Sequence, residues 1–258
     1  MVRKLIVFDV DGTLLSSQNS ILSNTILAIQ NLKSEGHIVA LATGRSRFLI
    51  QGILNDLSIS TYIICNGAAA FHDEQQICDF PLNNEKLLEL SLFLDERSVD
   101  LALTGLDGIS RTTTNDVERI ASVMSSLGGE LPKFDPTYIE QNNIYQGLGF
   151  YTDNLDGTFE TKFPSFRFVR WNNECVDVIA KDSSKATTLL KLAQKMDIAQ
   201  EDIIAFGDGN NDIEMLSLAG VGVAMGNAND NVKSVANIVT TSNNHDGIYN
   251  GLKQLNLV

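Results

Sequence analysis

The sequence predicts an α/β protein, in which a mostly parallel sheet with helices on both faces is interrupted by an inserted, mixed α/β domain. Two observations carry this prediction. Short apolar segments alternate with helical segments at both ends of the chain, which is typical of parallel sheets covered by helices. Between about Pro81 and Asp182 the alternation gives way to strand-like and helical pieces in mixed order. A chain of 258 residues is long enough to bury the cores of two lobes.

The N-terminal part is expected to form two strand–helix units and a third strand. The first strand is the almost continuously apolar Leu5–Val10. The first helix carries apolar residues at helical spacing and ends at Gly36, a residue that commonly terminates helices. The segments after the first strand are predicted as helix Ser23–Glu35, strand His37–Ala42, helix Arg45–Leu57 and strand Tyr62–Cys65.

The C-terminal part repeats this alternation. Its predicted segments are strand Asp202–Phe206, helix Asn210–Leu218, strand Val221–Ala224, helix Asn229–Ala236 and strand Ile238–Thr240. We therefore assign residues 1–81 and 183–258 to one core domain and residues 82–182 to the inserted domain. Within the insertion we expect strands Val99–Thr104, Tyr145–Tyr151, Arg167–Trp171 and Cys175–Ile179 and helices Glu85–Arg97 and Asp116–Leu127.

Composition excludes several classes of function. Apolar residues make up 43% of the chain and charged residues 20%, as in ordinary globular proteins. The net charge of −13, with no run of Lys or Arg, argues against nucleic acid or membrane surfaces as partners. Three widely spaced cysteines without a Cys-x-x-Cys pair favour a reducing, cytoplasmic location. We expect neither a signal segment nor a membrane span, and a monomer or weak homodimer.

Acidic residues follow the first predicted strand. Asp9 lies at the strand's carboxyl end, where ligands bind in open α/β sheets, and Gly12 permits a turn that can return Asp11 to the same space. Two carboxylates in one pocket repel each other and require a cation, and hard oxygen ligands suit Mg²⁺. The alternative is a solvated Asp-Gly turn.

A second acidic motif follows the strand Asp202–Phe206. In Gly207-Asp208-Gly209-Asn210-Asn211-Asp212, Asp208 could complete a metal site with Asp9. Asn211 and Asp212 are expected in the first turn of a helix, where free N–H groups favour anions or acceptors. Simple helix capping is the alternative for this motif considered alone.

Two further segments can supply donors and positive charge to a phosphate. Thr43-Gly44-Arg45 closes the second predicted strand and offers a hydroxyl and an unobstructed backbone N–H. Lys185 begins the predicted helix Ser184–Met196 and is the cation placed to neutralise a phosphoryl group, although many such lysines are only solvated. A cation is needed because two like charges 4 Å apart repel by about 4 kcal/mol at an effective dielectric near 20.

Taken in order, these motifs resemble the haloacid dehalogenase-like superfamily, and within it the Cof-type phosphatases. The likeness extends almost from end to end. Three shorter stretches add to it: Asn66-Gly67-Ala68, Gly226-Asn227-Ala228 and Asp246-Gly247-Ile248. One departure is Ala180-Lys181-Asp182-Ser183-Ser184 before Lys185, where relatives commonly carry a small or Gly-rich turn.

The resemblance implies a Rossmann-like core with an inserted α/β cap. It implies that Asp9 is the nucleophile and Asp11 the general acid and base of a phosphatase. Mg²⁺ would be bound by the Asp9 carboxylate, the Asp11 backbone carbonyl and Asp208, with Asp212 in support. The residues implied to hold the transferring phosphate are Val10, Thr43, Gly44, Lys185 and Asn211.

The expected function is Mg²⁺-dependent hydrolysis of small phosphorylated metabolites, such as sugar phosphates, nucleotides, flavin mononucleotide or pyridoxal phosphate, through a phospho-aspartyl intermediate. A phosphomutase would share every motif. A non-catalytic phospho-ligand-binding protein would also use clustered Asp, Thr and Lys, but Asp11 and the inserted domain argue against it. Dehalogenation is disfavoured because it does not need Asp11. The isolated histidines, including His37, are expected at the surface or its boundary, and Trp171 is expected to be a core aromatic of the cap rather than a substrate contact.

Overall fold

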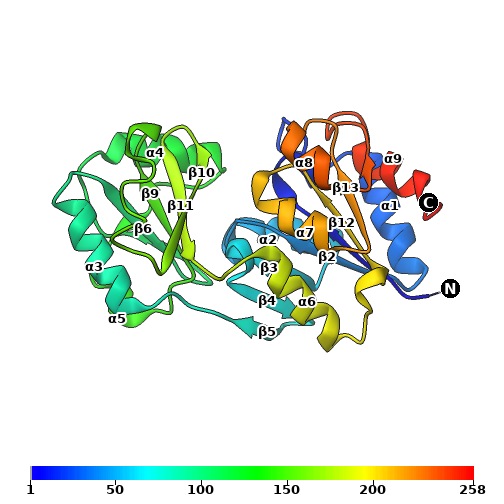
Figure 1. Ribbon diagram of the computed structural model, residues 1–258, viewed down its shortest axis with the longest axis horizontal. Helices are drawn as coiled ribbons and strands as arrows, with labels where there is room; N and C mark the ends of the chain where they lie inside the picture. The colour runs from blue at the N-terminus through cyan, green and yellow to red at the C-terminus, as the bar shows by residue number, and fades with distance from the viewer. Residues whose placement is uncertain (1) are drawn as a thin grey trace. The chain divides into compact units, whose positions relative to one another are not determined.

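The computed structural model describes residues 2–258, which divide into two compact units (Figure 1). The first unit comprises the chain up to Thr43, Gly52–Asp79 and Ser184–Val258, and the second comprises Gly44–Gln51 and Phe80–Ser183. Each unit has a sheet of its own. No helix of residues 2–258 combines the length and the apolar character that crossing a membrane requires.

The first unit is built on an eight-stranded sheet in the order β14-β13-β12-β1-β2-β3-β4-β5. Its parallel strands are β1 (Leu5–Phe8), β2 (Ile38–Ala42), β3 (Thr61–Ile64), β12 (Ile203–Gly207), β13 (Val221–Ala224) and β14 (Ile238–Val239). β4 (Ala69–His72) and β5 (Gln75–Asp79) extend one edge as an antiparallel hairpin. β1, β2, β3 and β12 are buried along their whole length, which explains why they are continuously apolar rather than alternating.

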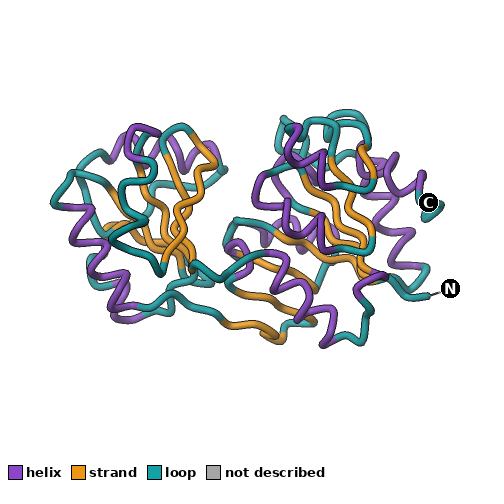
Figure 2. Tube along the Cα trace, viewed as in Figure 1, coloured by secondary structure: helices purple, strands orange, loops and turns teal. Residues whose placement is uncertain are grey.

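Helices lie beside this sheet in two groups (Figures 1 and 2). α1 (Ser23–Ser34) packs next to α9 (Gly247–Gln254), whereas α6 (Lys185–Lys195) packs next to α7 (Ile213–Leu218), which also contacts α8 (Asp230–Val235). α2 (Arg47–Leu57) connects β2 to β3. The predicted fold class, a Rossmann-like parallel sheet with helices on both faces and an inserted α/β domain, is confirmed.

β1 lies at the centre of the sheet, between β2 and β12. The chain runs from β1 outward through β2 and β3, but β12 and its successors add on the opposite side of β1. Open α/β sheets bind ligands at the carboxyl ends of their strands where the strand order reverses in this way. Asp9 directly follows β1, Thr43 directly follows β2, and Asp208 directly follows β12.

The second unit contains a six-stranded sheet in the order β10-β11-β9-β6-β7-β8. Its strands are β6 (Asp100–Thr104), β7 (Ile109–Arg111), β8 (Lys133–Phe134), β9 (Gln146–Phe150), β10 (Phe166–Asn172) and β11 (Cys175–Ala180), and its helices are α3 (Asn84–Asp95), α4 (Val117–Ser126) and α5 (Tyr138–Gln141). Alternate residues of β6 enter different apolar clusters: Leu101 and Leu103 join one with α3, and Ala102 joins the other with α4. Both faces of this sheet are therefore covered.

Several details differ from the sequence-based expectations. The hairpin β4–β5 turns at Asp73 and Glu74, which adopt positive φ without the Asn-Gly signal that predicts such turns. The helix predicted from Asn210 is a short helical turn over Asn210–Asp212 followed by α7. His37 is buried, at 5% exposure, because its Nδ1 accepts the Lys4 backbone N–H between two strands. Trp171 is 38% exposed and belongs to neither cluster, so its assignment to the cap core is wrong.

Candidate active site

The turn after β1 is built around a glycine. The Asp9 N–H donates to the Phe206 carbonyl at 3.0 Å, which continues the pairing with β12, and the Leu14 N–H donates back to the Asp9 carbonyl at 3.2 Å. Gly12 has φ +75°, and a Cβ built there would lie 2.2 Å from Asp208 Oδ2. Glycine is thus required by conformation and by space, and the turn packs directly against the acidic residue that follows β12.

Asp208 is oriented by two hydrogen bonds from different turns. Thr13 Oγ1 donates to its Oδ1 at 2.9 Å, and Asn227 Nδ2 donates to its Oδ2 at 3.1 Å. Asn227 Nδ2 also donates to the Gly12 carbonyl at 2.8 Å, and Asn227 Oδ1 accepts the Asn243 N–H at 3.0 Å. The turns after β1, β12 and β13 are therefore joined through this carboxylate and this amide.

Asp212 is completely buried. Its Oδ2 accepts the backbone N–H groups of Asp208 and Gly209, at 3.0 and 2.9 Å, so the side chain closes the turn in which Asp208 lies. Gly207 makes room for it, because a Cβ at that position would lie 2.6 Å from the Asp212 Cβ. Asp212 thus fixes the backbone from which Asp208 projects.

Lys185 enters the same cluster from α6 and is 1% exposed. Its Nζ lies 2.6 Å from Asp9 Oδ1 and 2.7 Å from Asp212 Oδ1. The helix start that carries it is capped by Ser184, whose Oγ accepts the Thr187 N–H at 3.2 Å. The sequence left open whether Lys185 is only solvated; the structure shows that it is not.

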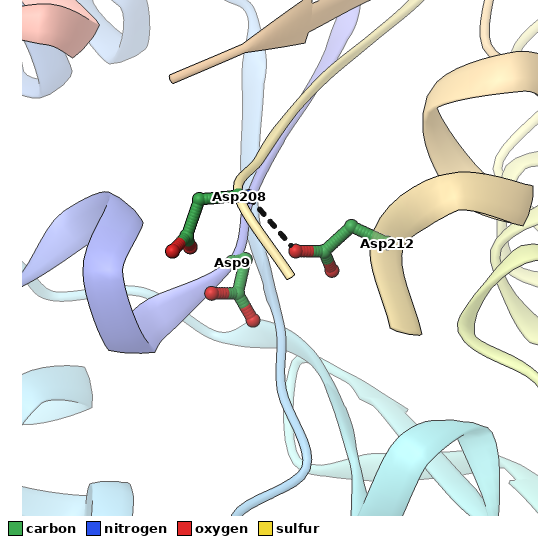
Figure 3. Close-up of side chains that lie close together, drawn as sticks. All are labelled: Asp9, Asp208 and Asp212. Carbon is green, nitrogen blue, oxygen red and sulfur yellow. Dashed lines mark hydrogen bonds between the residues drawn. The ribbon is translucent and has the colours of Figure 1, made fainter. Parts of the chain in front are cut away.

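The three carboxylates converge (Figure 3). Each of Asp9, Asp208 and Asp212 offers one oxygen, and these oxygens all lie within 4.8 Å of one another. Residues nearly 200 positions apart in the chain meet because β1 and β12 are neighbours with parallel register, Phe8 pairing with Phe206. The juxtaposition of Asp9 with Asp208, on which the sequence-based hypothesis of a shared ion depends, is present.

The other predicted site residues are not members of this three-carboxylate cluster. Val10 and Thr43 are fully buried, and the Thr43 N–H donates to the Ile63 carbonyl at 3.0 Å. Asn211 is exposed and donates through Nδ2 to Asn66 Oδ1 at 3.0 Å. The Asp11 side chain is exposed and is not one of the three clustered carboxylates, and Gly44 begins the segment grouped with the second unit.

Comparison with known proteins identifies the family. The model of the haloacid dehalogenase-like hydrolases matches residues 6–252. The chain belongs to this family. It is 34% identical to YkrA of Bacillus subtilis (strain 168) over the whole of both chains. It is 29% identical to the 5-amino-6-(5-phospho-D-ribitylamino)uracil phosphatase YitU of the same organism, over 97% of this chain and 96% of that protein.

Structural comparison agrees. The crystal structure of the subclass IIB sugar phosphatase BT4131 covers 99% of this chain and all of its own, with a TM-score of 0.88 and 30% identity. The resemblance predicted from the motifs is therefore confirmed. The predicted enzyme class, the phosphoric monoester hydrolases, is confirmed at the level of the haloacid dehalogenase-like family.

The electrostatics of this haloacid dehalogenase-like site are dominated by burial and by excess negative charge. Burial raises the pKa of Asp9 well above its usual range, Asp212 and Asp208 raise it further, and Lys185 opposes them. Burial also raises the pKa of Asp208 to about 6. Burial by itself lowers the pKa of Lys185, but the charges of Asp212 and Asp9 outweigh it and raise that pKa. Lys185 is therefore a fixed cation.

The donor set fits a hard divalent cation such as Mg²⁺. Three carboxylates face one ammonium, so the ionised cluster keeps an excess of two negative charges. Each oxygen of Asp208 accepts one hydrogen bond and retains a further lone pair. Asp212 already accepts from Lys185 and two backbone N–H groups, which favours a supporting position over direct ligation.

Two residues that the site uses were given no role by sequence reasoning. Asn227 and Asn66 were noted only as parts of family-like stretches, yet Asn227 holds Asp208 and Asn66 holds Asn211. Both lie just beyond the carboxyl ends of parallel strands, β13 and β3. That position is the signal that could have identified them, because every such turn opens toward the same edge of the sheet.

Proposed function

We propose that this protein is a Mg²⁺-dependent phosphatase that hydrolyses small phosphorylated metabolites through a phospho-aspartyl intermediate on Asp9. The observation that carries the proposal is the meeting of Asp9, Asp208, Asp212 and Lys185 at the carboxyl ends of β1 and β12. A buried nucleophilic carboxylate with a fixed ammonium 2.6 Å away is an arrangement that can receive a phosphoryl group.

The proposed reaction has two steps at phosphorus. A carboxylate oxygen of Asp9 forms a bond to phosphorus while the ester P–O bond breaks, and Asp11 donates a proton to the departing alkoxide. Water then attacks the aspartyl phosphate, Asp11 takes its proton, and inorganic phosphate leaves with Asp9 restored. The exposure of Asp11 supports this role, because the group must meet both a leaving group and a water molecule.

The remaining residues hold charge and orientation. When bound by Asp9, the Asp11 carbonyl and Asp208, Mg²⁺ would reduce the repulsion between a phosphate dianion and the cluster. Lys185 neutralises part of the charge on the equatorial oxygens. Thr43 and Asn211 add a hydroxyl and an amide donor, and Val10 and Gly44 add backbone N–H groups.

The substrate class follows from the relatives. YitU is named for a phosphoribitylamino-uracil and BT4131 for a sugar phosphate. Both names describe a phosphate monoester on a small metabolite. We infer the same class for this chain.

Release of inorganic phosphate tests the proposal. We expect release from at least one member of a panel of sugar phosphates, nucleotides, flavin mononucleotide, pyridoxal phosphate and the phosphoribitylamino-uracil, with loss of activity when EDTA replaces Mg²⁺. Asp9→Asn should abolish turnover. Mass spectrometry of the acid-quenched wild-type enzyme should find one phosphoryl group on the peptide containing Asp9, and none in the variant.

Asp202→Asn is the matched control, since Asp202 immediately precedes β12 at the strand's opposite end and contacts Lys4 at 2.9 Å. It should retain the wild-type rate. A near-normal rate in Asp9→Asn would remove Asp9 from the mechanism, and a product that retains its phosphate would reveal a mutase instead.

A further inference from the structure

The bend that follows β3 has an unusual backbone. Cys65, Asn66 and Gly67 have φ values of +49°, +54° and +101° in succession. Residues with side chains rarely adopt this left-handed region, and Asn tolerates it better than most. Two such residues before a glycine persist only where the surroundings hold them, and such conformations cluster at functional sites.

The surroundings of this bend are the proposed phosphate-binding elements. The Asn66 N–H donates to the Thr43 carbonyl at 3.0 Å. The Gly67 carbonyl accepts the Thr188 hydroxyl of α6 at 2.6 Å. A Cβ at Gly67 would lie 2.3 Å from the Ser184 carbonyl, so the bend packs against the residue preceding Lys185 without space for a side chain.

The side chain of Asn66 continues this bridge to a third element. It is 2% exposed, and its Oδ1 accepts Asn211 Nδ2 at 3.0 Å. On the other side, the Asn211 amide lies against Gly209, where a Cβ would come within 2.5 Å of Asn211 Oδ1. The Asn211 amide is thus held between the bend and the turn after β12.

This contact decides which end of the Asn211 amide faces a ligand. An Asn amide carries two N–H donors on nitrogen and an acceptor oxygen, and rotation by half a turn exchanges them. The hydrogen bond to Asn66 directs the nitrogen end toward the bend, and that nitrogen carries one further N–H donor. Without that acceptor the oxygen end could take the same position and repel a phosphate oxygen.

We propose that Asn66 is a positioning residue that fixes the Asn211 amide as a phosphate donor and couples it, through Thr43, to the turn after β2. The inference rests on the proposed function, in which Asn211 binds the transferring phosphate, and adds a residue that need not touch it. Asn66→Gly isolates the side chain, because glycine removes the acceptor while accepting the left-handed backbone without steric strain.

Titration calorimetry with inorganic phosphate in Mg²⁺ buffer measures the effect without any turnover. We expect Asn66→Gly to weaken phosphate binding about ten-fold, the loss of one hydrogen bond to an anion, with the melting temperature nearly unchanged. Asn256→Gly is the matched control, since Asn256 has the same φ of +54°, is exposed and follows α9. It should bind phosphate as the wild type does.

A double-mutant cycle separates positioning from a general structural effect. If Asn66 acts through Asn211, adding Asn66→Gly to Asn211→Ala should change phosphate affinity less than two-fold. An undiminished ten-fold loss in that background, or wild-type affinity in Asn66→Gly alone, overturns the inference. A wild-type protein that binds phosphate but hydrolyses no ester would instead refute the proposed function and leave this test intact.

Discussion

Replacing Lys185 by Met tests the electrostatic account of the site most directly. The Lys185 ammonium is buried between Asp9 and Asp212, at 2.6 and 2.7 Å. At these distances each attraction is about 6 kcal/mol with an effective dielectric of 20, before desolvation is subtracted. Removing one partner of a buried ion pair leaves the others uncompensated, and the net cost is about 3–5 kcal/mol. For a chain of this size that corresponds to a fall in melting temperature of roughly 6–20 °C.

The assay is thermal unfolding followed by circular dichroism, first with EDTA and then with Mg²⁺. We expect the full loss in EDTA at about pH 8 and a smaller loss at about pH 5, because Asp9 and Asp208, whose pKa values are raised, take up protons at low pH and their repulsion is relieved. The direction of this pH dependence follows from Asp9: Lys185 lowers the pKa of Asp9, so removing Lys185 raises that pKa further. Mg²⁺ should restore part of the stability without restoring turnover.

Lys195→Met provides the control, since Lys195 is exposed in the last turn of the same helix. Its change should stay below about 1 kcal/mol. If Lys185→Met has the same melting temperature in EDTA as the wild type and Lys195→Met, the Lys185 ammonium does not stabilise the carboxylate cluster and the reasoning is refuted.

Three further predictions concern the proposed metal site. Gly12→Ala should lower Mg²⁺ affinity in calorimetry by at least about ten-fold, because the added Cβ clashes with Asp208. Gly36→Ala is the control: Gly36 has φ +84° and no atom within 4 Å of the added Cβ, so this variant should show only the backbone strain. Equal Mg²⁺ affinities in the two variants would contradict this reasoning. Asn227→Ala should weaken Mg²⁺ binding about ten-fold, because Asp208 loses one of the two donors that orient it, and unchanged binding would exclude that role. In the folded state the pKa of Asp208 is raised from its usual 3.8 to about 6, so in EDTA between these two pH values the folded state binds a proton that the unfolded state has lost. The free energy of unfolding should therefore fall by up to about 3 kcal/mol as the pH rises through this range. Asp208→Asn should make that fall shallower, and an unaltered profile would show that Asp208 does not titrate there.

Much of the fold could be predicted because the signals are local. The buried strands of the first unit are short apolar runs, and β13 was predicted with its observed bounds. The antiparallel hairpin β4–β5 and the strands β7 and β8 escaped prediction, because they are short, partly polar and stabilised by their neighbours in the sheet. His37 and Trp171 were misplaced because burial of a single side chain depends on what packs over it.

The sequence alone determined which chemistry is available: acidic residues directly after strands, a glycine that permits the first turn, and a lysine at the start of a helix. Only the tertiary structure decided which of them meet. Asp9 joins Asp208 and Asp212 because β12 pairs with β1 across almost 200 intervening residues, and the partner choice of parallel strands leaves no mark in either segment. The tertiary structure likewise places Lys185, from α6, between two carboxylates and Asn66, from the bend after β3, against Asn211, since these contacts depend on how the elements are arranged in space rather than on neighbouring residues.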